Sequence, residues 1–304
     1  MNKVISALFL AMLLSFAGLT VSAGAADPFQ TARQEGEKLA VQRAYFTELI
    51  NSGDVFSVNA AYDEFTKQIT VTESAIGRVS GKERRNSLNA SYIKPAKIQK
   101  ERVIYELSQY RLMNKVGWDM ISNRTSTNNG DLAKLARLVT RAEQIKKDGG
   151  YGVLPAFFNQ YLRSYEGQLK SREFVSYVRG PKIGQFDYDV LLITNEERVK
   201  NKLKPFTLDM KLSNVALEKS KDMYTKKYFN HQSPTYGSPF DMMKKFGITY
   251  HYAGENIAQG YNNPKAVVNG WMNSPGHRAN ILNANFSRLG TGYHQQLWTQ
   301  MFTG

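Results

Sequence analysis

Apolar residues at helical spacing dominate the first half of this chain. Between residues 27 and about 180 they recur three and four positions apart, for example at Tyr62, Phe65 and Ile69, as on the buried face of an α-helix. Polar runs interrupt the pattern, among them the stretch from Asn123 to Gly130. The spacing predicts an all-α domain in which four or five antiparallel helices, joined by short loops, pack as a helical bundle.

Near Val190 the pattern changes, and helical segments begin to alternate with strand-like ones. A helix is predicted from about Asp209 to Tyr228, and β-branched and aromatic residues predict strands within Thr249 to Tyr252 and Leu289 to Met301. This mixture predicts an α+β fold. We therefore divide the chain into a signal peptide, the helical N-terminal domain, a linker marked by Gly180-Pro181 and an α+β domain, at residues 1–26, 27–180, 181–189 and 190–304.

The N-terminal residues are typical of a secretory signal peptide. Lys3 precedes a mostly apolar run from Val4 to Val21, and the small residues Ala23-Gly24-Ala25 follow. Removal of this segment predicts a secreted, extracellular protein with no transmembrane span left; the alternative is that the segment stays as an uncleaved anchor. The chain has no cysteine, which excludes disulfide bonds and thiolate chemistry.

The formal charge of +14 is divided evenly along the chain, since the part from Val190 onward has 14 basic and 7 acidic residues. A diffuse positive charge on an exported protein suits an anionic cell-wall polymer or an envelope protein as partner. An equally good interpretation is a solvated basic surface with no partner. No arginine-rich helix, zinc-finger spacing or aromatic RNA-binding motif is present, so a nucleic-acid partner is not predicted.

Three short polar groups near the C-terminus contain the candidate functional residues His231, Glu255 and His277. The chain has only four histidines, and these three residues are separated by 24 and 22 positions, so only the tertiary fold can bring them together. Two neutral imidazoles and one carboxylate are a ligand set of open zinc sites. The alternative is that each side chain is a hydrogen-bonded structural residue, and spacing alone favours that alternative.

The stretch from about Leu191 to the C-terminus resembles a bacterial member of the CAP superfamily, which is also called the SCP/PR-1-like or cysteine-rich secretory protein family. Four segments match in one register: Asn195-Glu196-Glu197-Arg198, the run from Tyr228 to Pro234, the run from Ala253 to Ala258, and the run from Trp271 to Leu282. Eukaryotic members are commonly disulfide-bonded. The absence of cysteine therefore indicates a bacterial export product, from a Gram-positive cell.

The resemblance implies a three-layer α-β-α sandwich with a cleft that family members often line with two histidines and two acidic residues. His231, Glu255 and His277 match three of the four. The segment that would supply the second acid reads Met272-Asn273-Ser274 and has no carboxylate. If Ser274 caps a helix, His277 lies in its first turn, where the helix dipole favours the neutral imidazole.

Three functional classes stay open. The favoured one is an extracellular or cell-envelope binding module whose cleft, formed by His231, Glu255 and His277, binds a divalent metal such as Zn²⁺ or a small ligand. The alternative is a hydrolase in which zinc-bound water, or a histidine–glutamate pair acting on a serine such as Ser233, carries out the reaction. In the third, these residues only brace the fold. No residue is assigned a catalytic role, because neither Gly-x-Ser-x-Gly nor His-Glu-x-x-His occurs.

Overall fold

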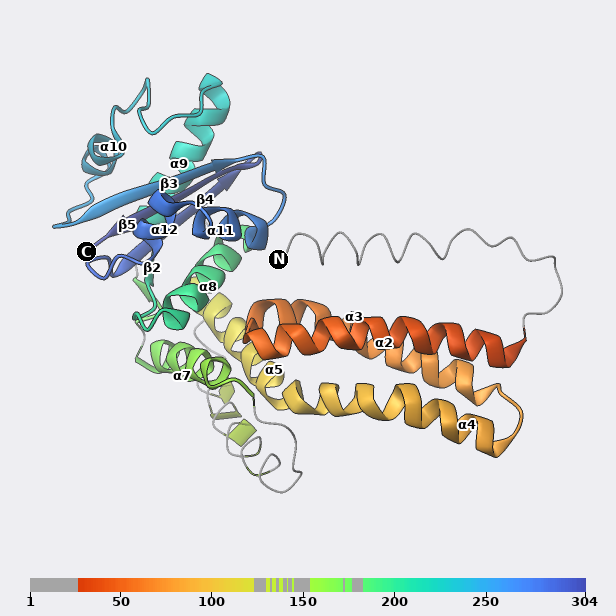
Figure 1. Ribbon diagram of the computed structural model, residues 1–304. Helices are drawn as coiled ribbons and strands as arrows, with labels where there is room; N and C mark the ends of the chain where they lie inside the picture. The colour runs from red at the N-terminus through yellow and green to blue at the C-terminus, as the bar shows by residue number, and fades with distance from the viewer. Residues whose placement is uncertain are drawn as a thin grey trace.

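The computed structural model describes residues 27–122, 154–171, 173–176 and 183–304, together with scattered positions between 130 and 144. The predicted signal peptide and Gly180-Pro181 of the predicted linker lie outside the described residues. Figure 1 shows a helical N-terminal part and a C-terminal part that contains the sheet. Among the described residues, no helix is both long enough and apolar enough to cross a membrane.

The N-terminal part is helical, as predicted. Its elements are α2 (Pro28–Ser52), α3 (Val55–Gly77), α4 (Lys82–Leu88), a π-helical turn η2 (Asn89–Ile93), α5 (Lys94–Ile121) and α7 (Ala156–Ser171). The first helices run side by side as long rods, with α4 at the end of the bundle far from the sheet (Figure 1). The side chains of Asp27 and Asp54 cap the N-termini of α2 and α3 by accepting hydrogen bonds from backbone N–H groups of the first turn.

The π-helical turn η2 accommodates a proline and a bulky side chain. Pro95 follows it and has no N–H to donate, and the backbone widens just before it, so that the Lys94 N–H bonds to the Asn89 carbonyl five residues back. The ring of Tyr92 packs against Gly36 of α2, where a Cβ atom would lie only 2.3 Å from a ring carbon. Glycine at position 36 therefore permits the close approach of α2 and η2.

The C-terminal part contains a five-stranded mixed sheet with the strand order β1-β2-β4-β5-β3. The strands are β1 (Val175–Ser176), β2 (Thr207–Asp209), β3 (Ala253–Gln259), β4 (Arg288–His294) and β5 (Leu297–Thr303). The pairs β1–β2 and β2–β4 are parallel, whereas the pairs β4–β5 and β5–β3 are antiparallel. Strand β3 is last in the strand order and is therefore an edge strand. Strand β1 comes from within the range predicted for the helical domain.

Helices cover both faces of the sheet, as the α-β-α expectation requires. Helix α9 (Met210–Lys226) packs on β4 and β5 across one face, and α8 (Gln185–Lys200), α11 (Pro264–Met272) and α12 (Pro275–Ile281) lie on the other. The short α10 (Pro239–Lys245) packs near β3. Gly290 and Gly292 allow α9 to lie close to β4, because a Cβ atom at either position would meet the backbone of α9 at 2.3 Å or less.

The predicted strand over Thr249 to Tyr252 is wrong, since those residues precede the strand, which begins at Ala253. Strand β3 has small and polar residues with weak strand propensity, and it forms because all seven of its residues pair with β5. The prediction over Leu289 to Met301 is confirmed as the hairpin of β4 and β5.

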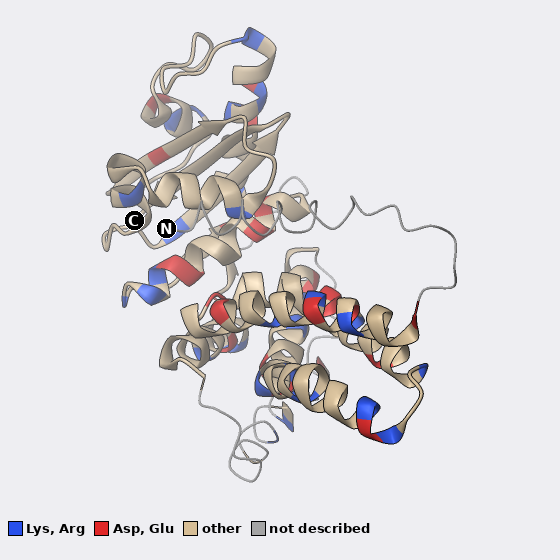
Figure 2. Cartoon of the chain, turned by 45° about the vertical axis from the view of Figure 1, so that its right-hand side comes forward, with Lys and Arg blue, Asp and Glu red and all other residues tan. Residues whose placement is uncertain are grey.

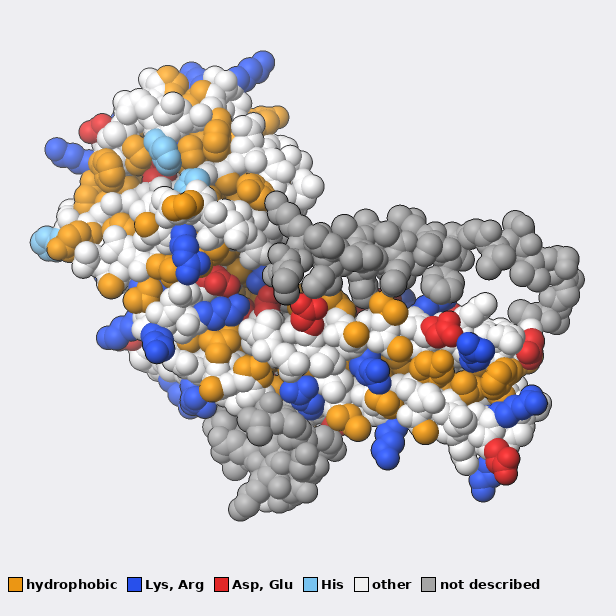
Figure 3. Space-filling view, viewed as in Figure 1, with side chains coloured by type: hydrophobic (Ala, Val, Ile, Leu, Met, Phe, Trp, Pro, Cys, Tyr) orange, Lys and Arg blue, Asp and Glu red, His pale blue; other side chains and the backbone are white. Residues whose placement is uncertain are grey.

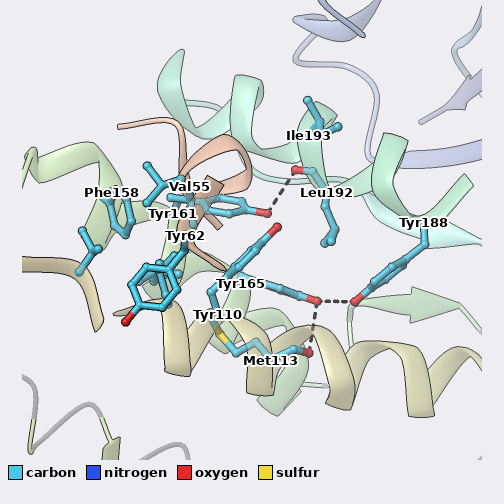
Figure 4. Close-up of a cluster of buried hydrophobic side chains, with 14 of the residues drawn as sticks. Val55, Tyr62, Tyr110, Met113, Phe158, Tyr161, Tyr165, Tyr188, Leu192 and Ile193 are labelled. Atoms are coloured by element: carbon cyan, nitrogen blue, oxygen red, sulfur yellow. Dashed lines mark hydrogen bonds between the residues drawn. The ribbon is translucent and has the colours of Figure 1, made fainter. Parts of the chain in front are cut away.

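One hydrophobic cluster runs through both parts of the chain, from Ala32 to Phe302, beside two smaller clusters in the C-terminal part. Helix α8 lies at its centre and begins at Gln185, inside the range predicted as linker. Figure 4 shows tyrosines of the N-terminal helices against α8: the Tyr161 hydroxyl donates to the Leu192 carbonyl at 3.2 Å, and the hydroxyls of Tyr165 and Tyr188 lie 2.6 Å apart. The two parts are therefore packed together rather than joined only by a linker.

Candidate functional site

The fold brings His231 and Glu255 into direct contact. The Nδ1 atom of His231, in the loop that follows α9, lies 2.6 Å from Oε1 of Glu255, in strand β3. The Glu255 side chain is 2 % exposed, whereas the His231 side chain is 53 % exposed. The pair therefore consists of a fixed, buried carboxylate and an imidazole open to solvent, with Nε2 of His231 left for other partners.

The second oxygen of Glu255 is a buried acceptor. Oε2 has no hydrogen-bond partner among the described residues, although the side chain is almost completely enclosed. Leaving a buried acceptor unpaired costs about 1–3 kcal/mol. Such an atom marks a position where a ligand with a hydrogen-bond donor or a positive charge gains more than it would at a solvated carboxylate.

His277 lies in the first turn of α12, and Ser274 is the N-cap residue of that helix, as predicted. The Ser274 hydroxyl caps no backbone N–H; instead it lies 2.9 Å from Nδ1 of His277. Burial and the nearby charge of His231 lower the pKa of His277 below 6.5. The predicted neutral imidazole agrees with this direction.

In the space-filling view, histidine side chains gather on the face of the sheet-containing part, next to an acidic side chain and among hydrophobic ones (Figure 3). Phe229 lies two positions before His231 and is one of the large hydrophobic residues that are exposed, at 47 %. This aromatic residue was not among the predicted site residues.

Asn256 ties α12 to the edge strand. Its side-chain amide donates to the His277 carbonyl at 3.1 Å and to Gln300 Oε1 at 3.2 Å, and its Oδ1 accepts from Asn280 at 2.9 Å. The same Asn280 amide donates to the Glu255 carbonyl at 3.1 Å. The backbones of Glu255 and His277 are therefore held by one buried network, which fixes the spacing of the two site residues.

The outward carbonyls of β3 are covered by side chains from the neighbouring helices. Asn280 of α12 bonds to the carbonyl of Glu255, and the indole N–H of Trp271 donates to the carbonyl of Ile257 at 3.2 Å. Trp271 is buried, as expected of a core residue. Two carbonyls at the free edge of the sheet, in the strand that carries Glu255, therefore already accept hydrogen bonds.

Two residues of α9 that the sequence did not point to support the site. Lys219 is completely buried, and Asp222 is 7 % exposed. Lys219 follows Val215 and Ala216 on the apolar face of the helix and precedes Met223, so a lysine stands at a core position of the helical pattern. That interruption of the apolar stripe is the signal by which Lys219 could have been recognised.

Ser233 has a structural role in the loop. It is 4 % exposed, its hydroxyl donates to Asp222 Oδ2 at 2.6 Å, and its Oγ accepts the backbone N–H groups of Thr235 and Tyr236. With its proton held by Asp222, Ser233 shapes the loop after His231. These bonds remove the support for Ser233 as the nucleophile of a hydrolase.

A metal ion needs several side-chain ligands arranged around one point. Within the described part of the chain, no three His, Cys, Asp or Glu side chains are arranged so that they could hold one. His231, Glu255 and His277 therefore do not form a three-ligand metal site in this arrangement.

A hollow lies beside the residues that precede β3. It has a volume of about 710 Å³, and its lining includes Lys211, His251 and Arg288. Lys211 and Arg288 both have partners within the protein, because Lys211 donates to the Gly247 carbonyl and Arg288 pairs with Asp209 at 3.2 Å. The hollow contains none of the three site residues, and its lysine and arginine are already paired, so the His231–Glu255 pair is the better candidate.

Comparison with known families decides what the C-terminal part is. Residues 191–302 match the family model described as the cysteine-rich secretory protein family, CAP. The C-terminal part of this chain is a CAP domain. Residues 20–97 match a second model, described as the SbsC C-terminal domain, which lies over the first helices of the N-terminal part and which the sequence analysis did not anticipate.

Two proteins of Bacillus subtilis (strain 168) are similar to the chain. The "Uncharacterized protein YkwD" is 56 % identical over 124 residues, which is 40 % of this chain and 48 % of that protein. The "Uncharacterized membrane protein YlbC" is 33 % identical over 183 residues, which is 58 % of this chain and 53 % of that protein. The chain thus spans about half the length of the curated relatives it matches.

Solved structures are also similar to part of the chain. An extracellular protein containing an SCP domain, from Bacillus anthracis str. Ames, is 33 % identical with a TM-score of 0.38, over 45 % of this chain and 49 % of that one. An outer surface protein from Borrelia burgdorferi is 24 % identical with a TM-score of 0.37, over 41 % of this chain and 97 % of that one.

Proposed function

We propose that this CAP-domain chain is a secreted binding module of the extracellular space or cell envelope, and that the cleft of His231, Glu255 and His277 takes a small ligand. The observation that carries the proposal is the buried, unpaired Oε2 atom of Glu255, whose other oxygen contacts His231. Leaving this oxygen without a donor costs free energy that a bound donor group would recover. A ligand that brings its own donor completes the site.

The chemistry of the cleft defines the ligand class. Glu255 Oε1 is occupied by His231 Nδ1, so the ligand meets Oε2, and it meets the histidines through their other ring nitrogens. A primary ammonium group, or a pair of hydroxyl groups, satisfies a carboxylate oxygen and a neutral imidazole together. A ligand of this class is expected to bind less tightly to Glu255→Gln and to His231→Ala, whereas the histidine control His294→Ala leaves the affinity unchanged.

Zinc is the first probe for the site, since imidazole nitrogens and carboxylate oxygens are its usual protein ligands. Titration calorimetry of the chelator-treated full chain with Zn²⁺, repeated on His231→Ala, His277→Ala and the control His251→Ala, tests the predicted metal. Equal zinc affinity in wild type and in both cleft variants would remove this cleft as a metal site. It would leave the small-ligand proposal to be tested by native mass spectrometry of the secreted protein, which detects retained small molecules.

A second candidate function, hydrolysis, is favoured by one contact, the 2.9 Å distance between Ser274 Oγ and Nδ1 of the neutral His277. A serine activated in this way reacts with a fluorophosphonate: its oxygen bonds to phosphorus, fluoride leaves and the proton passes to His277. Labelling of wild type that is lost in Ser274→Ala would promote the hydrolase. The binding module predicts that neither protein is labelled.

The proposed location rests on the N-terminal sequence and on charge. The apolar run before Ala23-Gly24-Ala25 is of the signal-peptide type, and the net charge of +14 suits an anionic envelope. Lys and Arg residues are spread over both parts of the molecule (Figure 2). Fractionation of a Gram-positive host into medium, wall and cytoplasm, with mass spectrometry of the mature N-terminus, tests both secretion and wall association.

A further inference from the structure

Two side chains of α9 bond to the loop between α9 and α10 that contains His231. The Nζ atom of Lys219 donates to the carbonyls of Asn230 and His231, at 2.9 and 2.8 Å, and lies 3.2 Å from the Tyr228 hydroxyl. An ammonium group has three protons, so these acceptors saturate it. This accounts for a lysine that is completely buried.

The second residue, Asp222, lies one helical turn further along the same face of α9. Its carboxylate accepts hydrogen bonds from the hydroxyls of Tyr228, Ser233 and Thr235, at 2.6, 2.6 and 2.7 Å. Lys219 and Asp222 together bind both ends of the loop, but only Lys219 bonds to the backbone of His231 itself.

We infer that Lys219 is a positioning residue that orients His231 toward Glu255 from the buried side of the loop. The backbone of His231 is fixed at its carbonyl and at that of the preceding residue, which sets the direction in which the imidazole leaves the chain. The ring then meets Glu255 Oε1 at 2.6 Å although more than half of the side chain is in solvent. An exposed histidine without such a support would sample several rotamers.

Charge supports the same arrangement. Burial lowers the pKa of Lys219, and the negative charges of Glu255 and Asp222 oppose this effect. The two negative charges therefore help to keep the ammonium group of Lys219 charged at this buried position. Its role in ligand binding rests on the proposed function, whereas its effect on the His231 ring does not.

The test is an NMR measurement on the full chain, labelled with ¹⁵N and ¹³C, treated with chelator and kept at constant neutral pH. In wild type, we expect couplings across hydrogen bonds from the Lys219 ammonium nitrogen to the carbonyl carbons of Asn230 and His231, and a His231 ring with its proton fixed on Nδ1. In Lys219→Met, which keeps the chain length but has no donors, the ring ¹⁵N signals of His231 should shift toward the average of the two tautomers, while those of His277 stay in place.

Two matched variants separate positioning from general loss of structure. Lys221→Met removes an exposed lysine from the same helix. Asp222→Asn weakens the hydrogen bonds that Ser233 and Thr235 donate to position 222. Neither variant should change the His231 tautomer. A folded Lys219→Met protein with unchanged His231 signals overturns the inference. If Lys219→Met does not fold, the couplings across hydrogen bonds in the wild-type protein are the test. Their absence overturns the inference. None of these measurements requires a ligand. They therefore test the role of Lys219 independently of the proposed function.

Discussion

The carboxylate of Glu196 in α8 accepts a hydrogen bond from the backbone N–H of Val55, 141 positions earlier in the chain, at 2.9 Å. Its other oxygen accepts from the N–H of Phe56 at 3.3 Å, and Asp54 caps the N–H of Ser57. The first turn of α3 is therefore capped partly by its own N-cap residue and partly by the CAP domain. A residue of a CAP-like sequence segment thus holds a helix of the N-terminal part.

Replacement of Glu196 should destabilise the junction of the two parts. Glu196→Ala leaves two N–H groups at the start of α3 without acceptors, and loss of an N-cap acceptor lowers the free energy of unfolding by about 1–2 kcal/mol. Glu197→Ala, at the partly exposed neighbouring position, is the control and should change it by less than about 0.5 kcal/mol. Urea denaturation followed by circular dichroism measures both, and equal midpoints would show that the cap contributes nothing.

Gly292 should tolerate no side chain. A Cβ atom there would lie 2.1 Å from the backbone nitrogen of Leu217 in α9, so Gly292→Ala must push the helix off the sheet. We expect a loss of about 2–3 kcal/mol in the free energy of unfolding. Gly167, inside α7, has nothing within 4 Å of its Cβ position, and Gly167→Ala should add about 0.5–1 kcal/mol. Thermal unfolding of the two variants should shift in opposite directions.

Asn256 should be needed for both stability and the cleft. Asn256→Leu keeps the approximate volume but leaves the buried amide of Gln300 and the His277 carbonyl with fewer partners, which lowers the free energy of unfolding by about 1–3 kcal/mol. It should also shift the NMR signals of the His277 ring. The exposed Asn273 supplies the control, Asn273→Ala. A His277 ring that is unmoved in a folded Asn256→Leu protein would contradict the proposed role of the network.

Asp222 should make the protein sensitive to acid. Burial acts to raise the pKa of Asp222, but hydrogen bonds from Ser233, Tyr228 and Thr235 and the charge of Lys219 bring it below 3.8. Because the folded protein holds the proton less tightly than the unfolded chain, this stabilisation is present above about pH 4 and is lost as the pH falls through the folded pKa. Urea midpoints measured over this range should fall more steeply for wild type than for Asp222→Asn. The exposed Asp63→Asn should follow wild type.

Particular residues show what the sequence could predict. The local sequence pattern predicted the start of α12, because Ser274-Pro275 is a strong N-terminal signal. It also predicted the strand residues that form the hairpin of β4 and β5. It missed β3, whose Ala-Gly-Glu-Asn residues form a strand only through pairing with β5. The contact of His231 with Glu255 was expected from the family resemblance rather than from spacing.

The supporting residues were harder to foresee for a physical reason. Lysine and glutamate are usually solvated, so residue type alone assigns Lys219 and Glu196 to the surface, and only the helical pattern of α9 argues otherwise for Lys219. Both are buried because their partners are backbone groups that only the tertiary fold brings near. The SbsC-like segment at residues 20–97 carries no motif that the sequence analysis recognised.

The hydrogen bonds from Asn280 and Trp271 to β3 have a consequence for how molecules of this protein meet one another. An uncovered edge strand is a template on which a second molecule adds its own strand, and repeated addition leads to insoluble fibres. With two of its carbonyls already bonded to side chains, β3 is a poor template. This feature favours molecules that stay separate when they are crowded together.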